Sequence, residues 1–265
     1  MMYTLKLSAP TVIKRRPLQS SDLPDDQKQV LEADVALEIQ SYGFERDHIK
    51  VAFAKDSFKG FNTWYIYRPH AQILKDGKVI FPANIPDVVK LPIPYKSQLD
   101  NMENPTGSCN VTSLAMCLEF LGASRKWQYS LRHRQFEDEL YRFALDNGLS
   151  RHDPHDLAVI VEKYGCRDDF QRNATIDKVK FWLSQGKPAV THGYFTSFGH
   201  IVVLAGFDKN GFLVHDPYGE WNSWGYDRNV PGSKNEKGKY IHYSYNLIRK
   251  VCMPDGNFWV HFISK

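Results

Sequence analysis

The chain has 265 residues, of which 42% are apolar and 14% aromatic, and its formal net charge is +4. This composition excludes a disordered chain, and the length allows one large domain or two modest ones. No apolar run approaches the roughly 20 residues of a membrane-spanning helix, so we expect no integral membrane segment. We also recognise no signal peptide, which predicts a protein that is cytoplasmic as synthesised and needs help from another protein to reach a cell wall.

The charge and the cysteines narrow the classes of partner. The basic residues are scattered and the net charge is mild, so we expect no nucleic-acid partner. Cys109, Cys117, Cys166 and Cys252 are too few and too dispersed for a disulfide framework, and no pair has the spacing of a zinc site. We therefore expect a reduced monomer with one functional thiol, no metal and no cofactor.

The first part of the chain, residues 1–85, reads as short strands separated by turns. The predicted strands are Thr11–Lys14, Val35–Tyr42, His48–Ala54, Thr63–Tyr67 and Ala71–Leu74, with a polar loop from Gln19 to Gln29. This pattern predicts a small all-β barrel. A strand that carries Trp64 after a glycine-containing turn resembles bacterial SH3-like domains, which implies binding to cell-wall peptide or glycan. The alternative is that the barrel only supports the second domain.

The second part, residues 86–265, follows a proline-rich linker marked by Pro82, Pro86, Pro92 and Pro94. The predicted helices span residues 109–122, 136–147, 153–165 and 175–183, and the predicted strands span residues 188–192, 200–207, 211–216, 240–245 and 258–263. Helices that precede an antiparallel sheet indicate an α+β fold.

Cys109 lies at the start of an apolar helical pattern that runs to Gly122. The unpaired N–H groups and the dipole at a helix N-terminus favour the thiolate, which is the reactive form of cysteine. The alternative is a buried thiol that acts as a small apolar side chain.

A nucleophilic cysteine needs a base and a group that orients the base. His200 begins an apolar strand and Asp216 ends the following strand, with a turn near Lys209 and Asn210. An antiparallel hairpin with this turn brings positions 200 and 216 to the same open end. We therefore expect the imidazole and the carboxylate to lie within reach of each other.

Four stretches carry a family resemblance. They are residues 88–101, residues 107–116 around Cys109, residues 199–207 after Gly199, and residues 214–217 around Asp216. From about Leu91 to the C-terminus the chain resembles the C39-like cysteine peptidases, which have a papain-like fold. The resemblance implies Cys109 as nucleophile, His200 as base and Asp216 as orienting acid. It also implies that Gln98 and the Cys109 backbone N–H form the oxyanion hole.

Gln98 lies eleven positions before Cys109, about twice the spacing usual in papain-like enzymes. The segment 100–106 must loop out if Gln98 is to reach the site, and Asn101 is the substitute donor. Exposed aromatic side chains supply contact area for a substrate. Tyr194, shortly before His200, and Trp221, in the aromatic loop 218–226, are the candidate substrate-binding residues together with Asn101. A packed structural loop is the alternative for the aromatic segment.

These features together predict a thiol-dependent amide hydrolase. An SH3-like barrel joined to a peptidase points to peptidoglycan peptides as substrate, as in a wall-lytic enzyme or a phage endolysin. One alternative is a cytoplasmic peptidase with a protein substrate. The other is a non-enzymatic binding protein on a degenerate peptidase fold, in which Cys109 would be no more reactive than Cys166 or Cys252.

Overall fold

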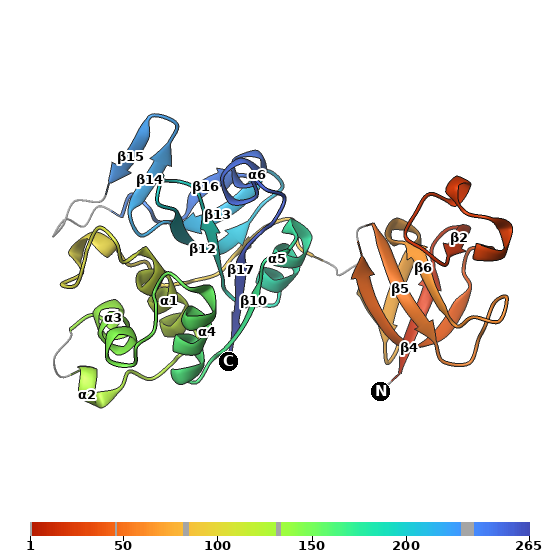
Figure 1. The fold of residues 1–265 in the computed structure, drawn as a ribbon, viewed down its shortest axis with the longest axis horizontal. Coiled ribbons are helices and arrows are strands. Elements are labelled where there is room, and N and C mark those ends of the chain that lie inside the picture. Colours follow the sequence, from red (N-terminus) through yellow and green to blue (C-terminus); the bar gives the residue numbers. More distant parts are fainter. Residues whose placement is uncertain (1, 46, 82–84, 131–133, 229–235) are drawn as a thin grey trace. The chain divides into compact units, whose positions relative to one another are not determined.

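The chain divides into two compact units, Met1–Asn84 and Ile85–Lys265 (Figure 1). The computed structural model describes residues 2–45, 47–81, 85–130, 134–228 and 236–265. Pro82 of the expected linker lies outside these residues. Each unit has its own buried apolar core. None of the helices in the described ranges combines the length and the hydropathy that crossing a bilayer requires.

The first unit is all-β, with one antiparallel sheet in the order β3-β2-β6-β5-β4-β1-β7-β8. Its strands are β1 Tyr3–Leu7, β2 Thr11–Lys14, β3 Lys28–Leu31, β4 Ala36–Glu45, β5 His48–Phe53, β6 Thr63–Tyr67, β7 Ala71–Lys75 and β8 Lys78–Phe81. Short 3-10 turns lie at Ser20–Asp22, Asp25–Gln27 and Arg68–His70. Trp64 is fully buried at the centre of the core and donates its indole N–H to the Phe61 carbonyl.

The sequence predicted five of these strands and missed β1, β3 and β8. The missed strand β3 begins at Lys28, inside the segment expected to be a polar loop. It is an edge strand that pairs only with β2 in the described sheet, so little of its surface is buried and its apolar signal is weak. The resemblance of this unit to SH3-like domains stays a prediction.

The second unit is built on a sheet in the order β10-β17-β11-β12-β13-β16, with β9 beside β12. The strands are β9 Val89–Lys90, β10 Arg167–Gln171, β11 Ala189–Gly193, β12 His200–Phe207, β13 Gly211–His215, β16 Ile241–Ser244 and β17 Val260–Ser264; β14 Gly219–Asn222 and β15 Gly225–Arg228 form a separate hairpin. The helices are α1 Cys109–Phe120, α2 Trp127–Ser130, α3 Phe136–Asp146, α4 Pro154–Lys163, α5 Ile176–Ser184 and α6 Tyr245–Cys252, with a 3-10 turn at Gln98–Asp100. The predicted α+β fold is confirmed.

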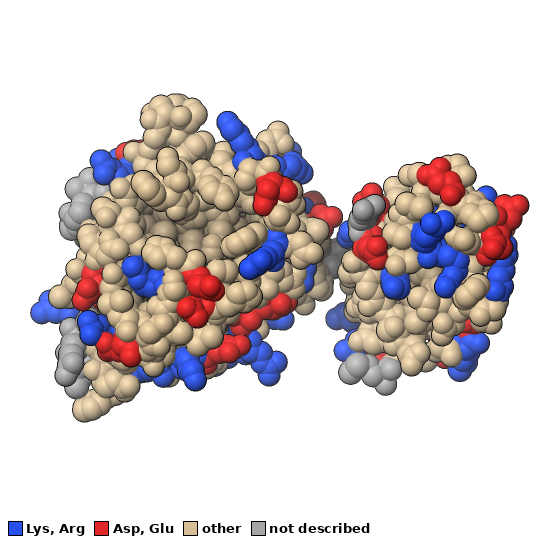
Figure 2. All heavy atoms as spheres, viewed as in Figure 1, with Lys and Arg blue, Asp and Glu red and all other residues tan. Residues whose placement is uncertain are grey.

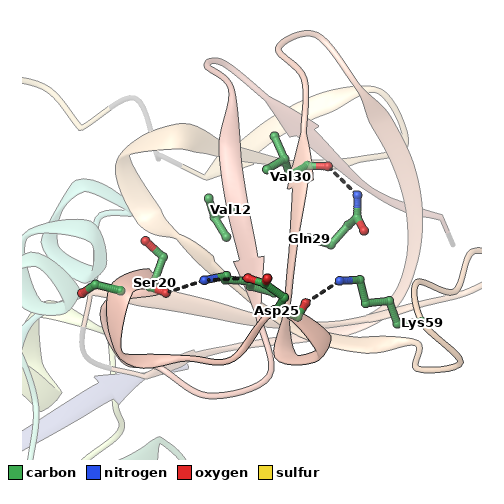
Figure 3. A pocket seen from close by; sticks show the side chains of 8 residues that line it. Val12, Ser20, Asp25, Gln29, Val30 and Lys59 are labelled. Atoms are coloured by element: carbon green, nitrogen blue, oxygen red, sulfur yellow. Dashed lines mark hydrogen bonds and ion pairs between the residues drawn. The ribbon is translucent and has the colours of Figure 1, made fainter.

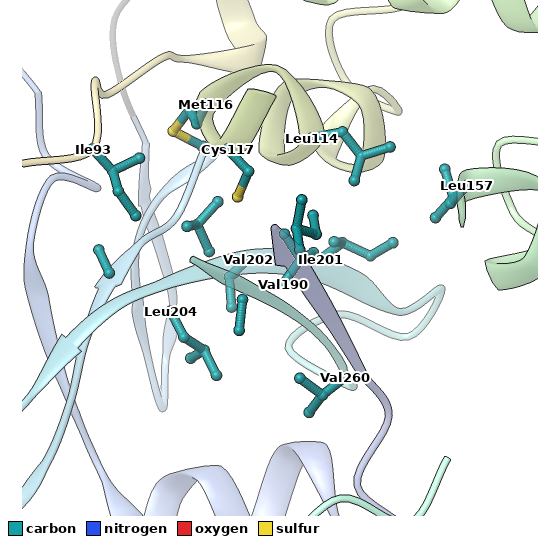
Figure 4. Packing of buried hydrophobic residues seen from close by; sticks show 14 of the residues in the cluster. Ile93, Leu114, Met116, Cys117, Leu157, Val190, Ile201, Val202, Leu204 and Val260 are labelled. Carbon is teal, nitrogen blue, oxygen red and sulfur yellow. The ribbon is translucent and has the colours of Figure 1, made fainter. Parts of the chain in front are cut away.

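Helix α1 is the central helix of the second unit. Its residues from Asn110 to Leu118 are all buried, which is typical of a helix surrounded by protein. Leu114 and Cys117 point from α1 toward the sheet in Figure 4. Ser113 Oγ donates to the Ile201 carbonyl over 3.1 Å, which ties the helix to β12. This packing places the first residue of α1 near the first residue of β12.

The helices and strands of the second unit that were not predicted are β9, β10, β14, β15, α2 and α6. Strand β10 has the sequence Arg-Asp-Asp-Phe-Gln, which lacks the alternation of apolar residues that marks a strand. The hairpin of β14 and β15 lies in the segment expected to be a loop. Helix α6 begins within the predicted strand 240–245, because Ser244 caps it by accepting the Leu247 N–H over 3.2 Å.

Candidate active site

Cys109 is the first residue of α1 and is partly exposed, whereas Cys117, Cys166 and Cys252 are buried. Its sulfur accepts the backbone N–H of Ile201, the second residue of β12. The unpaired N–H groups at the start of a helix also favour negative charge at this place. The position therefore combines access for a substrate with stabilisation of a thiolate.

His200 and Asp216 are in contact. The imidazole Nε2 lies 2.7 Å from the carboxylate Oδ1, and both side chains are buried. Strands β12 and β13 pair antiparallel with an irregularity between Leu204 and Gly206, and this hairpin brings the two residues together as predicted. Since Nε2 faces Asp216, Nδ1 is the imidazole nitrogen left for the Cys109 thiol, with which the ring is hydrogen-bonded.

The electrostatics of the three groups favour a thiolate–imidazolium pair. Burial opposes the charged imidazole, but the Asp216 carboxylate and Cys109 outweigh it and raise the pKa of His200 to about 10. Burial likewise opposes the thiolate, but the charge and hydrogen bond of His200 and the Ile201 N–H outweigh it and lower the pKa of Cys109. Each group thus stabilises the charged form of the other.

The Asp216 carboxylate receives three further hydrogen bonds. The phenolic hydroxyls of Tyr226 and Tyr243 donate to Oδ2 over 3.0 and 3.1 Å, and the backbone N–H of Tyr218 donates to Oδ1 over 2.9 Å. Together with His200 these donors satisfy a carboxylate that is fully buried. Neither hydroxyl donor was predicted from the sequence. Tyr226 lies in a loop that was expected to line a substrate groove, and Tyr243 lies in a later strand.

Gln98 is 1% exposed and lies beside the residue that follows Asp216. Its backbone N–H donates to the Pro217 carbonyl over 2.9 Å, and its side-chain Nε2 donates to the Pro105 carbonyl over 3.0 Å. Nε2 carries two protons, so one N–H is left for another acceptor. Tyr95 strengthens this connection because its hydroxyl donates to the Asp216 carbonyl over 2.9 Å.

The segment between Gln98 and Cys109 folds into a hydrogen-bonded loop. The N–H groups of Met102 and Glu103 donate to Asp138 Oδ1 on α3, over 2.9 and 3.2 Å. Ser108 Oγ donates to the carbonyl of Glu103 over 2.8 Å. The loop accommodates the long spacing while the backbone of Gln98 stays bonded to Pro217.

Asn101 is 6% exposed, and its side chain is directed to the interior. Its Nδ2 donates to Thr112 Oγ1 on α1 over 2.9 Å. Like Gln98 Nε2, Asn101 Nδ2 carries a second proton that this contact does not use. Gln98 and Asn101 therefore both stay candidate donors for the oxyanion hole.

Of the two aromatic residues expected to bind substrate, Tyr194 is 69% exposed and Trp221 is partly buried. The ring of Phe195 connects Trp221 to the site, with its centroid 6.2 Å from Trp221 and 6.0 Å from His200. The Phe195 ring therefore lies between Trp221 and the His200 imidazole, and Tyr194 directly precedes Phe195 in the chain.

Two exposed aromatic residues near the site were not among the predicted site residues. Phe198 has a relative exposure of 101% in the turn before His200, which Thr196 closes by donating its Oγ1 to the Gly199 carbonyl over 2.8 Å. Trp224 is 86% exposed in the turn between β14 and β15. Each ring offers apolar contact area to a ligand bound beside it.

A second histidine–aspartate pair lies elsewhere in the same sheet. His261 Nδ1 is 2.8 Å from Asp168 Oδ2, and His261 Nε2 is 2.9 Å from His192 Nε2. These residues come from β17, β10 and β11. Over the residues described, no group of three or more His, Cys, Asp or Glu side chains is arranged to hold a metal ion.

The sequence profile of the Peptidase_C39 like family matches residues 90–253. Among solved structures, a double glycine motif protease from an AMS/PCAT transporter, in complex with the leader peptide, is 18% identical with a TM-score of 0.39; the match covers 66% of this chain and 92% of that one. A protein described as a C39-like peptidase from Bacillus anthracis is 16% identical with a TM-score of 0.39, over 68% of this chain and 99% of that one. A search of curated proteins found no match. On the family match, the chain belongs to the Peptidase_C39 like family and is a cysteine peptidase.

Proposed function

We propose that the chain hydrolyses amide bonds in peptidoglycan peptides, with Cys109 as nucleophile, His200 as general base and acid, and Asp216 as the orienting acid. The observation that carries the proposal is the continuous contact from thiol to imidazole to carboxylate, with 2.7 Å between His200 Nε2 and Asp216 Oδ1. A nucleophile, a base and a group that orients the base are the parts that nucleophilic acyl transfer needs.

In the proposed reaction, the Cys109 proton resides on His200 Nδ1 and the thiolate attacks the amide carbon. The oxyanion accepts the Cys109 backbone N–H and the remaining N–H of Gln98 Nε2. The tetrahedral intermediate collapses as His200 gives its proton to the leaving amine, and a thioester remains. His200 then takes a proton from water, hydroxide attacks the thioester, and the acid product leaves with the thiol restored.

The exposed rings around the site support a peptide substrate. Three exposed rings offer apolar contact area. Tyr194 and Phe198 lie on the segment before His200, and Trp224 lies in the hairpin after Asp216. Figure 2 shows that positive and negative side chains are interspersed over the visible face of each unit. A peptide with small or apolar side chains is therefore a better fit to this surface than a highly charged polymer.

We propose that the first unit binds the wall through its aromatic face, which is the surface around the exposed ring of Phe44. Phe44 is 52% exposed, and the Arg68 guanidinium lies 5.2 Å from the centre of its ring. A groove of about 510 Å³ lined by Lys28 and Lys59 is the alternative surface (Figure 3). Both lysines already have partners, since Lys28 Nζ lies 3.1 Å from Asp25 Oδ1 and Lys59 donates to the backbone carbonyl of Asp25. The aromatic face therefore offers more to a ligand.

The test is the loss of turbidity of purified cell walls. We expect clearing by the intact chain and by Cys252→Ala, which removes a buried thiol, and none by Cys109→Ala. Mass spectrometry of the released products then identifies the bond. Equal clearing by Cys109→Ala would overturn the assigned nucleophile.

Two other outcomes separate the alternatives. If no wall type clears while Cys109 reacts rapidly with iodoacetamide, the hydrolase remains and the peptidoglycan substrate is wrong. If Cys109 reacts no faster than Cys166 or Cys252, the chain is a binding protein on a peptidase fold.

A further inference from the structure

Asp216 is held by more donors than an orienting acid needs for one histidine. Oδ1 accepts the His200 Nε2–H and the Tyr218 N–H, and Oδ2 accepts the hydroxyls of Tyr226 and Tyr243. A buried carboxylate is costly unless hydrogen bonds compensate for lost water. The two hydroxyls occupy the oxygen that does not face the histidine, so they fix the rotation of the carboxylate about its own axis.

Both tyrosines are committed as donors. Burial and then the Asp216 charge raise the pKa of Tyr226 and that of Tyr243 above the ordinary value, so both hydroxyls are protonated at neutral pH. The Tyr243 oxygen also accepts the Trp221 N–H over 2.9 Å, so its own proton is directed to Asp216. The orientation of each hydroxyl is thereby determined.

The hairpin of β14 and β15 reaches Asp216 through both of its strands. Tyr226 in β15 donates directly, and Trp221 in β14 donates through Tyr243. Trp221 and Tyr226 are cross-strand partners in this hairpin. The Tyr226 ring also stands edge-on to His200, with the ring centres 5.6 Å apart. The β14–β15 hairpin and the Asp216 carboxylate are thus joined in one hydrogen-bonded network.

We propose that Tyr226 and Tyr243 are positioning residues that hold Asp216 in the rotation in which Oδ1 accepts the hydrogen bond from His200 Nε2–H. This inference rests on the proposed function and deepens it. Through His200, the two hydroxyls stabilise the imidazolium and so the Cys109 thiolate. Because the turn of the same hairpin carries the exposed Trp224, a peptide bound at Trp224 rests on the element that orients the acid.

The test uses the full chain with Tyr226→Phe, Tyr243→Phe and the double variant. Phenylalanine keeps the rings and removes only the hydroxyls. The matched control is Tyr245→Phe, whose hydroxyl donates to the Asp208 carbonyl over 2.7 Å at the opposite end of the β12–β13 hairpin. The readout is the rate of Cys109 alkylation by iodoacetamide as a function of pH, with the modified site identified by mass spectrometry.

We expect each single variant to move the acid limb of the alkylation profile up by about 0.5–1 pH unit, and the double variant by more, because each substitution removes one donor that holds the charged carboxylate and the remaining donors compensate only in part. The control should keep the profile of the intact chain. An unchanged limb in the double variant overturns the inference, as does a uniform loss of rate with no shift. If the intact chain itself shows no rapid alkylation of Cys109, the proposed function fails instead.

Discussion

The second unit contains two histidine–aspartate pairs of nearly equal length that have different surroundings. His200 and Asp216 are 2.7 Å apart, and His261 and Asp168 are 2.8 Å apart. Both pairs are buried on one sheet, and each has a cysteine of α1 in its neighbourhood. The contact between imidazole and carboxylate is therefore not what distinguishes an active site in this fold.

The difference lies in which member of the pair the thiol meets. Cys109 contacts the imidazole of His200, and its pKa is lowered despite burial. Cys117, two turns further along α1, is buried and feels the negative charge of Asp168, so its pKa is raised well above the ordinary value. The same three residue types thus give a thiolate at one end of the helix and an inert thiol at the other.

The two histidines also differ in their third partner. His261 lies within β17 and its Nε2 contacts the Nε2 of His192. Burial, and then the neighbouring His261, lower the pKa of His192 to about 3, so His192 is neutral at ordinary pH. The His192–His261 contact and the contact of His261 Nδ1 with Asp168 Oδ2 form one buried chain across β11, β17 and β10. This chain of hydrogen bonds stabilises the sheet.

Replacing each histidine by alanine should separate the two roles, and we expect the largest effect here. His200→Ala should lower kcat/KM by about 10²–10⁴-fold, since the general base is lost, while the buried Asp216 keeps three other hydrogen-bond donors. His261→Ala should cost about 3–5 kcal/mol of stability by leaving Asp168 buried without its partner, and the folded fraction should keep its activity. Peptidase assays and urea unfolding measure the two effects.

The control is the pH profile of Cys109 alkylation, which His261→Ala should leave unchanged. A shift of that profile in His261→Ala would show that the second pair is coupled to the site, and the comparison would fail.

The first pair could be predicted from the sequence, because one hairpin contains both members. The turn near Lys209 and the lengths of the flanking strands place His200 and Asp216 at the same end, and this position together with the resemblance to the C39-like peptidases singled out His200 from ten histidines. Cys109 followed from its place before an apolar helix. Residues close in the chain and joined by regular strands leave few alternatives.

The second pair could not be predicted in the same way. Asp168 and His261 are 93 positions apart and meet only because β10 pairs with β17 at the edge of the sheet. Strand β10 was not recognised, and the pairing of distant strands has no local signal. Tyr226 and Tyr243 lie only 10 and 27 positions from Asp216, and their contacts were missed because the hairpin that carries Tyr226 was expected to be a loop.

Thiol labelling of the intact chain sharpens the comparison along α1. At pH 6 we expect Cys109 to react with iodoacetamide at least about 100-fold faster than Cys117, because only the thiolate reacts and an ordinary thiol has a pKa of about 8.5. The labelled sites are read by mass spectrometry after digestion. In denaturing urea the two rates should become similar. Equal rates in the folded chain would mean that the position on α1 does not determine the protonation state.

The smallest expected effect is the fall in the free energy of unfolding at acid pH that His192 causes. A folded-state pKa of about 3 lies below the unfolded value, so the stability that neutral His192 contributes is present above about pH 6.5 and is lost as the pH falls. Between pH 7 and pH 5 the unfolded chain takes up a proton that the folded chain excludes, which costs about 2 kcal/mol.

His192→Gln keeps an N–H donor for His261 and removes the titrating group, so its free energy of unfolding should fall by about 2 kcal/mol less between these pH values than that of the intact chain. His215, whose pKa is lowered to about 4 chiefly by burial, acts in the same direction and is present in both proteins. Urea unfolding followed by the helical circular dichroism signal reports on the second unit, which holds the α-helices of the described residues. An equal fall in both proteins would mean that His192 is protonated in the folded state, and the second pair would then end in a charged histidine, like the first.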